Sequence, residues 1–301
     1  MINHIILIGD ETSLLKNIEK QSKAILKYHE YKFSNDNFIY SFEDDTFEED
    51  VNIIADLSSN LHKELCGLFF LLDYFKRNNI AINYLFFPYF PYSRTNHIHK
   101  NQTANLFMIV EHLNLYDIKR IYCCDSHFQN QDIGLKAELN IIEQEDIFTE
   151  EFNKIIHENT IVIGPDRGSK KRVDKICSQF NIPGFCFDKK RINHQEKVVI
   201  KSNAKFDEII KKAAEIVLID DEICSGSTLK KITEYVSAAN PDCKINIFVT
   251  HSFMNNVPDF INNKNIKNVY TTNSIHLASK LKSKKIIIKD ISSIIAGELH
   301  D

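Results

Sequence analysis

The sequence predicts an α/β protein of two tandem domains, each with a mainly parallel sheet flanked by helices. The chain has 301 residues, about twice the roughly 150 residues of a typical domain. Short apolar runs rich in β-branched residues alternate with amphipathic stretches along nearly the whole chain, which is typical of βαβ units. Several apolar runs end in clusters of polar residues, and parallel sheets bind ligands at the carboxyl ends of their strands.

The predicted strands are short apolar runs. They are Ile5–Ile8, Ile53–Asp56, Tyr84–Phe87, Arg120–Cys124, Thr160–Ile163, Phe185–Phe187, Ile216–Ile219, Ile245–Thr250 and Ile286–Ile288. The predicted helices have apolar residues at helical spacing. They are Ser13–Leu26, Asn60–Phe75, Thr103–Leu113, Glu150–Ile156, Lys170–Phe180, Thr228–Ala239 and Ser274–Leu281. An acidic stretch near Gln144–Glu151 predicts a boundary, so we expect domains at residues 1–145 and 146–289 and a final segment, 290–301, that packs on the first domain.

Composition excludes several classes of protein. Lys and Arg number 37 against 41 Asp and Glu, and a net charge of −4 does not suit a nucleic-acid or anionic-membrane binder. No apolar run is long enough to cross a bilayer, and the first nine residues lack the pattern of a secretory signal. The seven cysteines are an odd number without a CxxC pair, which favours reduced thiols. We therefore expect a cytoplasmic protein that binds neither nucleic acid nor membranes.

The most informative segment is Val217–Thr228, in which an apolar strand leads to two carboxylates and then to small and hydroxyl residues. Backbone N–H groups at the start of the following helix suit a phosphate group, together with the hydroxyls of Ser225, Ser227 and Thr228. Asp220 and Asp221 would accept hydrogen bonds from the hydroxyls of a sugar. The alternative is a buried strand followed by a Ser-capped helix with two solvated acids.

A second segment, Gly164–Arg172, has the same order of strand, turn and helix. Gly168 permits close approach of the backbone to a phosphate, and Arg172 adds positive charge about one helical turn later. The alternative is an ordinary helix start in which Pro165 and Asp166 occupy favourable first-turn positions. Both interpretations are compatible.

Three further groups follow predicted strands, and each has a plain structural alternative. His127, in Asp125-Ser126-His127, is either a ligand or a structural histidine. Arg94 either contacts phosphate or adenine or forms a surface ion pair. Lys189 and Arg191 follow the predicted strand Phe185–Phe187. They belong either to a mobile basic loop that closes on a charged substrate or to a solvated turn.

Together these motifs resemble the ribose-phosphate pyrophosphokinase (PRPP synthetase) family, which has the type I phosphoribosyltransferase fold. Val217–Thr228 is similar to the family's PRPP-binding loop, and Gly164–Val173 is similar to its pyrophosphate loop. Pro88–Arg94 is similar to its PYFxYAR signature and Asp125–His127 to its DLH motif. Further similar segments are Lys32–Asn35, Asp188–Arg191 and Thr272–Ile275. The motifs occur in family order across nearly the full chain.

The resemblance implies Mg²⁺-dependent transfer of the pyrophosphoryl group of ATP to the 1-hydroxyl of ribose 5-phosphate. It also implies that the nucleotide lies largely on the first domain and the ribose on the second, and that the protein is a homo-oligomer. The implied catalytic residues are Lys189, Arg191 and His127, and the implied metal contacts are His127 and Asp166. The implied nucleotide contacts are Phe33, Asn35, Asn37, Arg94 and Thr95. The implied sugar and phosphate contacts are Asp220, Asp221, Cys224, Ser225, Gly226, Ser227, Thr228, Gly168 and Arg172.

The sequence departs from the family pattern in both loops and in the nucleotide region. Cys224 stands where many members carry Asp, Ser169 and Ser227 replace frequent glycines, and Asn37 replaces a Glu that reads adenine. These changes leave two alternatives open: a variant that acts on a larger 5′-substituted ribose such as ADP-ribose, and a non-catalytic regulatory subunit. A phosphoribosyltransferase would share the PRPP loop but would not explain Pro88–Arg94 or the basic loop.

Overall fold

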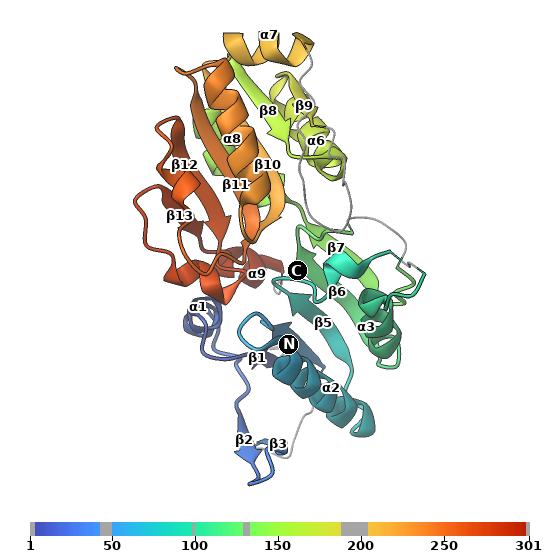
Figure 1. Ribbon diagram of the computed structural model, residues 1–301. Helices are drawn as coiled ribbons and strands as arrows, with labels where there is room; N and C mark the ends of the chain where they lie inside the picture. The colour runs from blue at the N-terminus through green and yellow to red at the C-terminus, as the bar shows by residue number, and fades with distance from the viewer. Residues whose placement is uncertain (1–3, 43–49, 98–99, 129–132, 188–203, 299–301) are drawn as a thin grey trace. The chain divides into compact units, whose positions relative to one another are not determined.

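The computed structural model describes residues 4–42, 50–97, 100–128, 133–187 and 204–298 (Figure 1). The chain divides into two compact units. The first comprises residues up to Ile142, Ser274–His276 and the chain from Asp290 onward, and the second comprises Glu143–Asn273 and Leu277–Lys289. Each unit has its own largely parallel sheet flanked by helices, which confirms the predicted fold class. The predicted domain boundaries at residues 145 and 289 stay a proposal.

The first unit has a five-stranded parallel sheet of order β1-β4-β5-β6-β7. Its strands are β1 His4–Ile8, β4 Val51–Ala55, β5 Ile82–Phe87, β6 Ile118–Cys124 and β7 Glu138–Ile142. Its helices are α1 Ser13–Gln21, α2 Leu61–Arg77, the 3₁₀ turn η1 Ser93–Thr95, α3 Asn105–Leu113 and α9 Ser292–Glu298. The apolar faces of α2 and α3 pack on the sheet to form the core. The segment that carries α9 lies against α1, where Asn17 donates to Asp290 at 2.8 Å.

A β-hairpin, β2 Tyr28–Lys32 and β3 Phe38–Phe42, extends the first unit and packs on α2. Tyr40 of the hairpin crosses α2 at Gly67, where a Cβ atom would overlap the tyrosine hydroxyl. An ion pair of 2.9 Å joins Lys63 of α2 to Glu30 of the hairpin. The hairpin is therefore held to α2 by a contact that requires glycine.

Replacing Gly67 with alanine is expected to lower the free energy of unfolding by about 1–2 kcal/mol. Alanine favours a helix by up to about 1 kcal/mol, but the clash with Tyr40 is an overpacking cost of about 1–3 kcal/mol. The double variant Gly67→Ala/Tyr40→Phe lacks the clashing hydroxyl and should recover most of the loss in urea denaturation. A single variant that is more stable than the original protein would contradict this contact.

The second unit has a six-stranded parallel sheet of order β13-β12-β11-β10-β8-β9. Its strands are β8 Thr160–Gly164, β9 Gly184–Cys186, β10 Glu215–Ile223, β11 Lys244–Ser252, β12 Ile266–Thr272 and β13 Ile286–Lys289. Its helices are α4 Gln144–Ile147, α5 Thr149–Ile155, α6 Lys170–Phe180, α7 Ala204–Lys212 and α8 Ser227–Ala239, with 3₁₀ turns η2 Arg167–Ser169, η3 Asp259–Asn262 and η4 His276–Lys280. Figure 1 shows α8 lying across β10 and β11, and side chains from these elements share one core.

Each of the nine predicted strands coincides with an observed strand to within a few residues, but several details of the prediction are wrong. The helix predicted at Ser13–Leu26 ends at Gln21, because the chain turns at Ser22 and Leu26 then donates to the carbonyl of Ile5. The helix predicted at Ser274–Leu281 is the 3₁₀ turn η4. The prediction omits the strands β2, β3, β7 and β12 and the helices α4, α7 and α9.

No helix in the part of the chain that the structure describes is both long and apolar enough to cross a membrane.

Candidate active site

The turn between β10 and α8 requires glycine at position 226. Gly226 has a φ of 70° and stands at the N-terminal end of α8, and a Cβ there would lie 2.6 Å from the ring of Phe260. Ser227 donates its backbone N–H to Ser225 Oγ at 3.3 Å, and the two hydroxyls lie 3.2 Å apart. Cys224, Ser225 and Ser227 are exposed, while Thr228 is half-buried. The first N–H groups of α8 have no acceptor within the helix. They therefore lie close to the exposed hydroxyls of Ser225 and Ser227.

Gly226→Ala is expected to lower the free energy of unfolding by about 2–3 kcal/mol. The left-handed backbone costs an alanine about 1–2 kcal/mol, and contact with Phe260 adds an overpacking cost. Gly134→Ala is a matched control, because Gly134 also has a positive φ, 76°, but its Cβ would meet nothing within 4 Å. Chemical denaturation should show the larger loss at position 226, and equal losses at the two positions would exclude the contribution of Phe260.

Asp220 and Asp221 lie inside β10, whereas the sequence predicted that the strand ends before them. Pairing with β11 continues through Glu222 and Ile223, which extends the strand past the polar residues. Asp221 is almost fully buried, and its Oδ2 lies 3.8 Å from Nη2 of Arg172, which is also buried. Burial raises the pKa of Asp220 well above its usual range, and the Asp221 and Asp166 carboxylates raise it further, while Arg172 lowers it.

The turn after β8 forms the other half of this cluster. Asp166 is half-buried and caps η2, where its Oδ1 accepts the backbone N–H of Gly168 at 2.8 Å. Gly168 is exposed, and Ser169, which follows it, is buried. Since β8 pairs directly with β10, the second unit brings Asp166, Gly168 and Arg172 to the same sheet edge as Asp220 and the Ser225–Thr228 turn.

In the first unit, the candidate residues follow β5 and β6, which are neighbours in the sheet. Asp125 after β6 is fully buried with a φ of 33°, and its N–H donates to the carbonyl of Ile142 at 2.8 Å. His127, two residues later, is exposed. Arg94 of η1 is also exposed, and η1 follows Tyr92, whose φ is 58°. Thr95 donates to the carbonyl of Tyr92 at 2.8 Å and accepts the N–H of Leu106, so its hydroxyl joins η1 to α3.

Phe33, Asn35 and Asn37 lie in the loop of the β2–β3 hairpin, where Asn35 Oδ1 accepts the N–H of Asn37 at 3.2 Å. They line a shallow cavity of about 830 Å³ together with Cys66 and Phe70 of α2. The aromatic ring of Phe33 is 43% exposed, which suits stacking on a planar group. Lys189 and Arg191 lie outside the described residues.

One buried residue that contacts the site in the second unit is not predicted from the sequence. Gln144 has no exposed surface, and its Nε2 donates to the backbone carbonyl of Asp220 at 2.7 Å. In the sequence Gln144 is an ordinary polar residue of an acidic boundary segment, and no local signal indicates that it contacts a strand more than 70 residues away.

Both halves of the chain match models of known domain families. Residues 4–115 match the N-terminal domain of ribose phosphate pyrophosphokinase, and residues 135–256 match the phosphoribosyl transferase domain.

Curated relatives and a solved structure agree with these matches. A ribose-phosphate pyrophosphokinase of Saccharolobus solfataricus is 23% identical over 253 residues, which cover 84% of each chain. The corresponding protein of Sulfolobus acidocaldarius is 23% identical over 257 residues, with 83% of this chain and 84% of that protein covered. The crystal structure of phosphoribosylpyrophosphate synthetase from Mycobacterium smegmatis has the same fold, with a TM-score of 0.82, 18% identity and coverage of 99% of this chain and 98% of that one. The chain belongs to the ribose-phosphate pyrophosphokinase family and is an enzyme of the diphosphokinase type.

Proposed function

We propose that the protein transfers the pyrophosphoryl group of ATP to the 1-hydroxyl of ribose 5-phosphate, giving PRPP and AMP. The observation that carries the proposal is the cluster at the carboxyl ends of β8 and β10. There the half-buried Asp220, the buried Asp221, a buried arginine and a glycine turn at the start of α8 share one sheet edge. This combination suits a ligand with both sugar hydroxyls and phosphate groups.

Each group of the second unit has a distinct task in this proposal. Asp220 and Asp221 accept hydrogen bonds from the ribose hydroxyls, and the turn of Cys224, Ser225, Gly226, Ser227 and Thr228 holds the 5-phosphate at the start of α8. Gly168 and Arg172 face the pyrophosphoryl group. The acceptor oxygen at C1 then attacks the β-phosphorus of ATP, and the bond to the α-phosphate oxygen breaks to release AMP.

In the first unit, Arg94 and His127 contact the phosphates of ATP, while Phe33, Asn35, Asn37 and Thr95 hold the adenosine. Exposure of the Arg94, His127 and Phe33 side chains supports these assignments, because a nucleotide needs accessible partners. Lys189 and Arg191 neutralise charge on the transferring group. The relatives' printed name, ribose-phosphate pyrophosphokinase, supports a ribose phosphate as the acceptor and pyrophosphoryl transfer as the reaction. We further propose a homo-oligomer.

The residues near β8 fit a magnesium ion. Mg²⁺ in nucleotide enzymes is usually held by one or two carboxylates together with phosphate oxygens and water. Asp166, a half-buried carboxylate at a strand end, is a ligand of this kind, and we propose that His127 contacts the bound metal through water or phosphate. When bound, Mg²⁺ would neutralise part of the polyphosphate charge. Among the described residues, no three His, Cys, Asp or Glu side chains form a group that could hold a metal alone.

A comparison of acceptors tests the proposed substrate. With ATP and Mg²⁺, release of AMP should be faster with ribose 5-phosphate than with ADP-ribose at equal concentration. Faster release with ADP-ribose would instead establish the variant acceptor that Cys224 and Ser227 suggest. If neither acceptor releases AMP and Lys189→Ala changes no measurable activity, the chain is a non-catalytic member of the family.

A further inference from the structure

The peptide bond between Asp220 and Asp221 is held from two sides. Gln144 donates to the carbonyl oxygen of this peptide at 2.7 Å, and the same amide donates to Thr250 Oγ1 on β11 at 3.1 Å. On the other side, the N–H of Asp221 donates to the carboxylate of Asp220 at 3.1 Å. Both side chains of the carboxylate pair leave the backbone on either side of this one peptide plane. Rotation of the plane would therefore move both carboxylates together.

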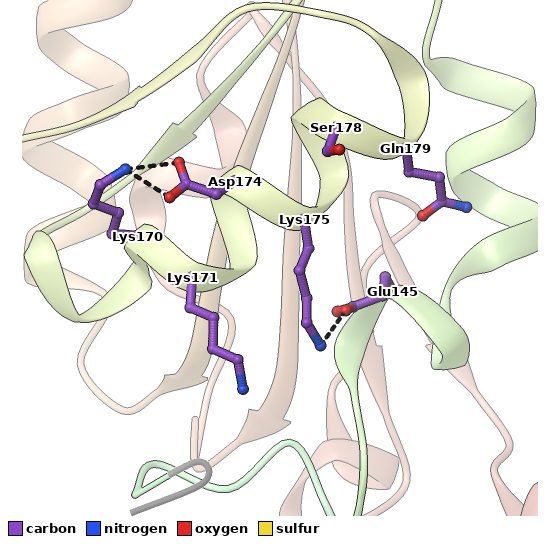
Figure 2. Close-up of a pocket in the computed structure, with 7 residues that line it drawn as sticks. All are labelled: Glu145, Lys170, Lys171, Asp174, Lys175, Ser178 and Gln179. Atoms are coloured by element: carbon purple, nitrogen blue, oxygen red, sulfur yellow. Dashed lines mark hydrogen bonds and ion pairs between the residues drawn. The ribbon is translucent and has the colours of Figure 1, made fainter.

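The residues on either side of Gln144 are anchored to α6. Glu143 Oε1 lies 3.0 Å from Lys175 Nζ and 3.2 Å from Lys171 Nζ. Glu145 Oε1 lies 2.7 Å from Lys175 Nζ, and Figure 2 shows this ion pair. Both glutamates are about nine-tenths buried, whereas the lysines are only partly so. Burial alone would raise the pKa of Glu143, but hydrogen bonds and charges of the lysines lower it below its usual range. The segment 143–145 is thus tied firmly to this helix.

Helix α6 begins directly after the turn that carries Gly168, and its buried Arg172 faces Asp221 at 3.8 Å. The segment 143–145 consequently contacts both halves of the second unit's cluster: β10 through Gln144, and α6 through Glu143 and Glu145. A shift of α6 relative to β10 would have to break at least one of these two sets of bonds.

We propose that Gln144 is a positioning residue, which orients Asp220 and Asp221 toward the ribose hydroxyls and couples their orientation to the pyrophosphate turn. This inference rests on the proposed function for its effect on the sugar. Because Gln144 has no exposed surface, it acts on the sugar through the peptide that it holds.

Gln144→Met tests the proposal, because methionine has a similar length and shape but no N–H donor. Asn246→Leu is the matched control: Asn246 is an equally buried amide on β11, and it bonds Glu215 at the opposite end of the sheet. Gln144→Asn retains the N–H donor on a shorter side chain, and it replaces Gln144→Met as the test if the methionine variant does not fold. Two measurements are compared for the three variants: steady-state kinetics with each substrate, and hydrogen–deuterium exchange of segment 217–228.

The proposal predicts that Gln144→Met raises KM for ribose 5-phosphate about tenfold, the size expected from loss of the hydrogen bond to the Asp220 carbonyl. KM for ATP should change less than twofold, and Gln144→Asn should recover part of the loss. Exchange in segment 217–228 should be faster than in the Asn246→Leu variant. Equal increases in both KM values, or the same changes in Asn246→Leu, would overturn the positioning role. If the original protein forms no PRPP, the proposed function fails, and unchanged exchange in Gln144→Met would then separately overturn the positioning role.

Discussion

Replacing Asp220 with asparagine is expected to lower PRPP formation by about 100-fold while raising the free energy of unfolding. The loss follows because a hydrogen bond from a sugar hydroxyl to a charged group contributes up to about 3 kcal/mol, which corresponds to about 100-fold. The gain follows because the free protein holds Asp220 near the Asp221 and Asp166 carboxylates, and asparagine removes one charge at nearly constant shape. A gain of about 1 kcal/mol would be typical of a stabilising substitution.

The gain in the free energy of unfolding from Asp220→Asn should increase as the pH rises from acid toward neutral. The pKa of Asp220 in the folded protein lies well above its ordinary value of 3.8, so the folded state binds this proton more tightly than the unfolded chain. Its contribution to stability is therefore lost progressively as the pH rises above 3.8. Urea denaturation should show a difference between Asp220→Asn and the original protein that is small in acid and grows toward neutral pH. A difference that shrinks as the pH rises would contradict the raised pKa.

Asp221→Asn provides the matched comparison for Asp220→Asn. Asp221 is the carboxylate that lies 3.8 Å from Arg172, so its replacement removes this attraction together with the repulsion of Asp220. We expect Asp221→Asn to be destabilising and Asp220→Asn to be stabilising. Equal effects on the free energy of unfolding would show that the two carboxylates do not differ in environment.

Replacing Arg172 with leucine is expected to destabilise the second unit by about 3–5 kcal/mol. The Arg172 side chain is 4% exposed, and its removal would take the guanidinium charge away from the buried Asp221 carboxylate. Loss of one member of a buried ion pair typically has a cost of this size. The double variant Arg172→Leu/Asp221→Asn should recover a large part of the loss, because it removes both charges. Chemical denaturation of the four proteins gives the coupling energy, and additive effects would mean that the pair does not interact.

Local patterns were sufficient to predict most of the fold, and nonlocal pairing accounts for the errors. Apolar runs such as Thr160–Ile163 can be recognised without knowing their partners, because a continuous run of apolar residues by itself predicts a buried strand. β12 was missed because Lys267 and Asn268 interrupt its apolar pattern, and its stability comes from pairing with β11 and β13 on either side. β7 was missed because it is an edge strand of mixed polarity, and among the described strands it pairs with β6 alone.

The same distinction applies to the candidate site. The turns at Gly168 and Gly226 follow from strand, glycine and helix-start signals within about ten residues, and the structure has both turns where the sequence predicts them. The extension of β10 through Asp220 and Asp221 depends on β11, so it could not be read from residues 217–228 alone. The contact between Gln144 and Asp220 joins distant segments, and only the folded chain reveals it.

The most direct test of the proposed transfer is the stoichiometry of its products. Purified protein is incubated with ATP, ribose 5-phosphate and Mg²⁺, and nucleotides and sugar phosphates are quantified together by phosphorus NMR. Attack on the β-phosphorus predicts AMP and PRPP in equal amounts, with no accumulation of ADP. Formation of ADP with ribose 1,5-bisphosphate, or no AMP at saturating concentrations of both substrates, would contradict pyrophosphoryl transfer to ribose 5-phosphate.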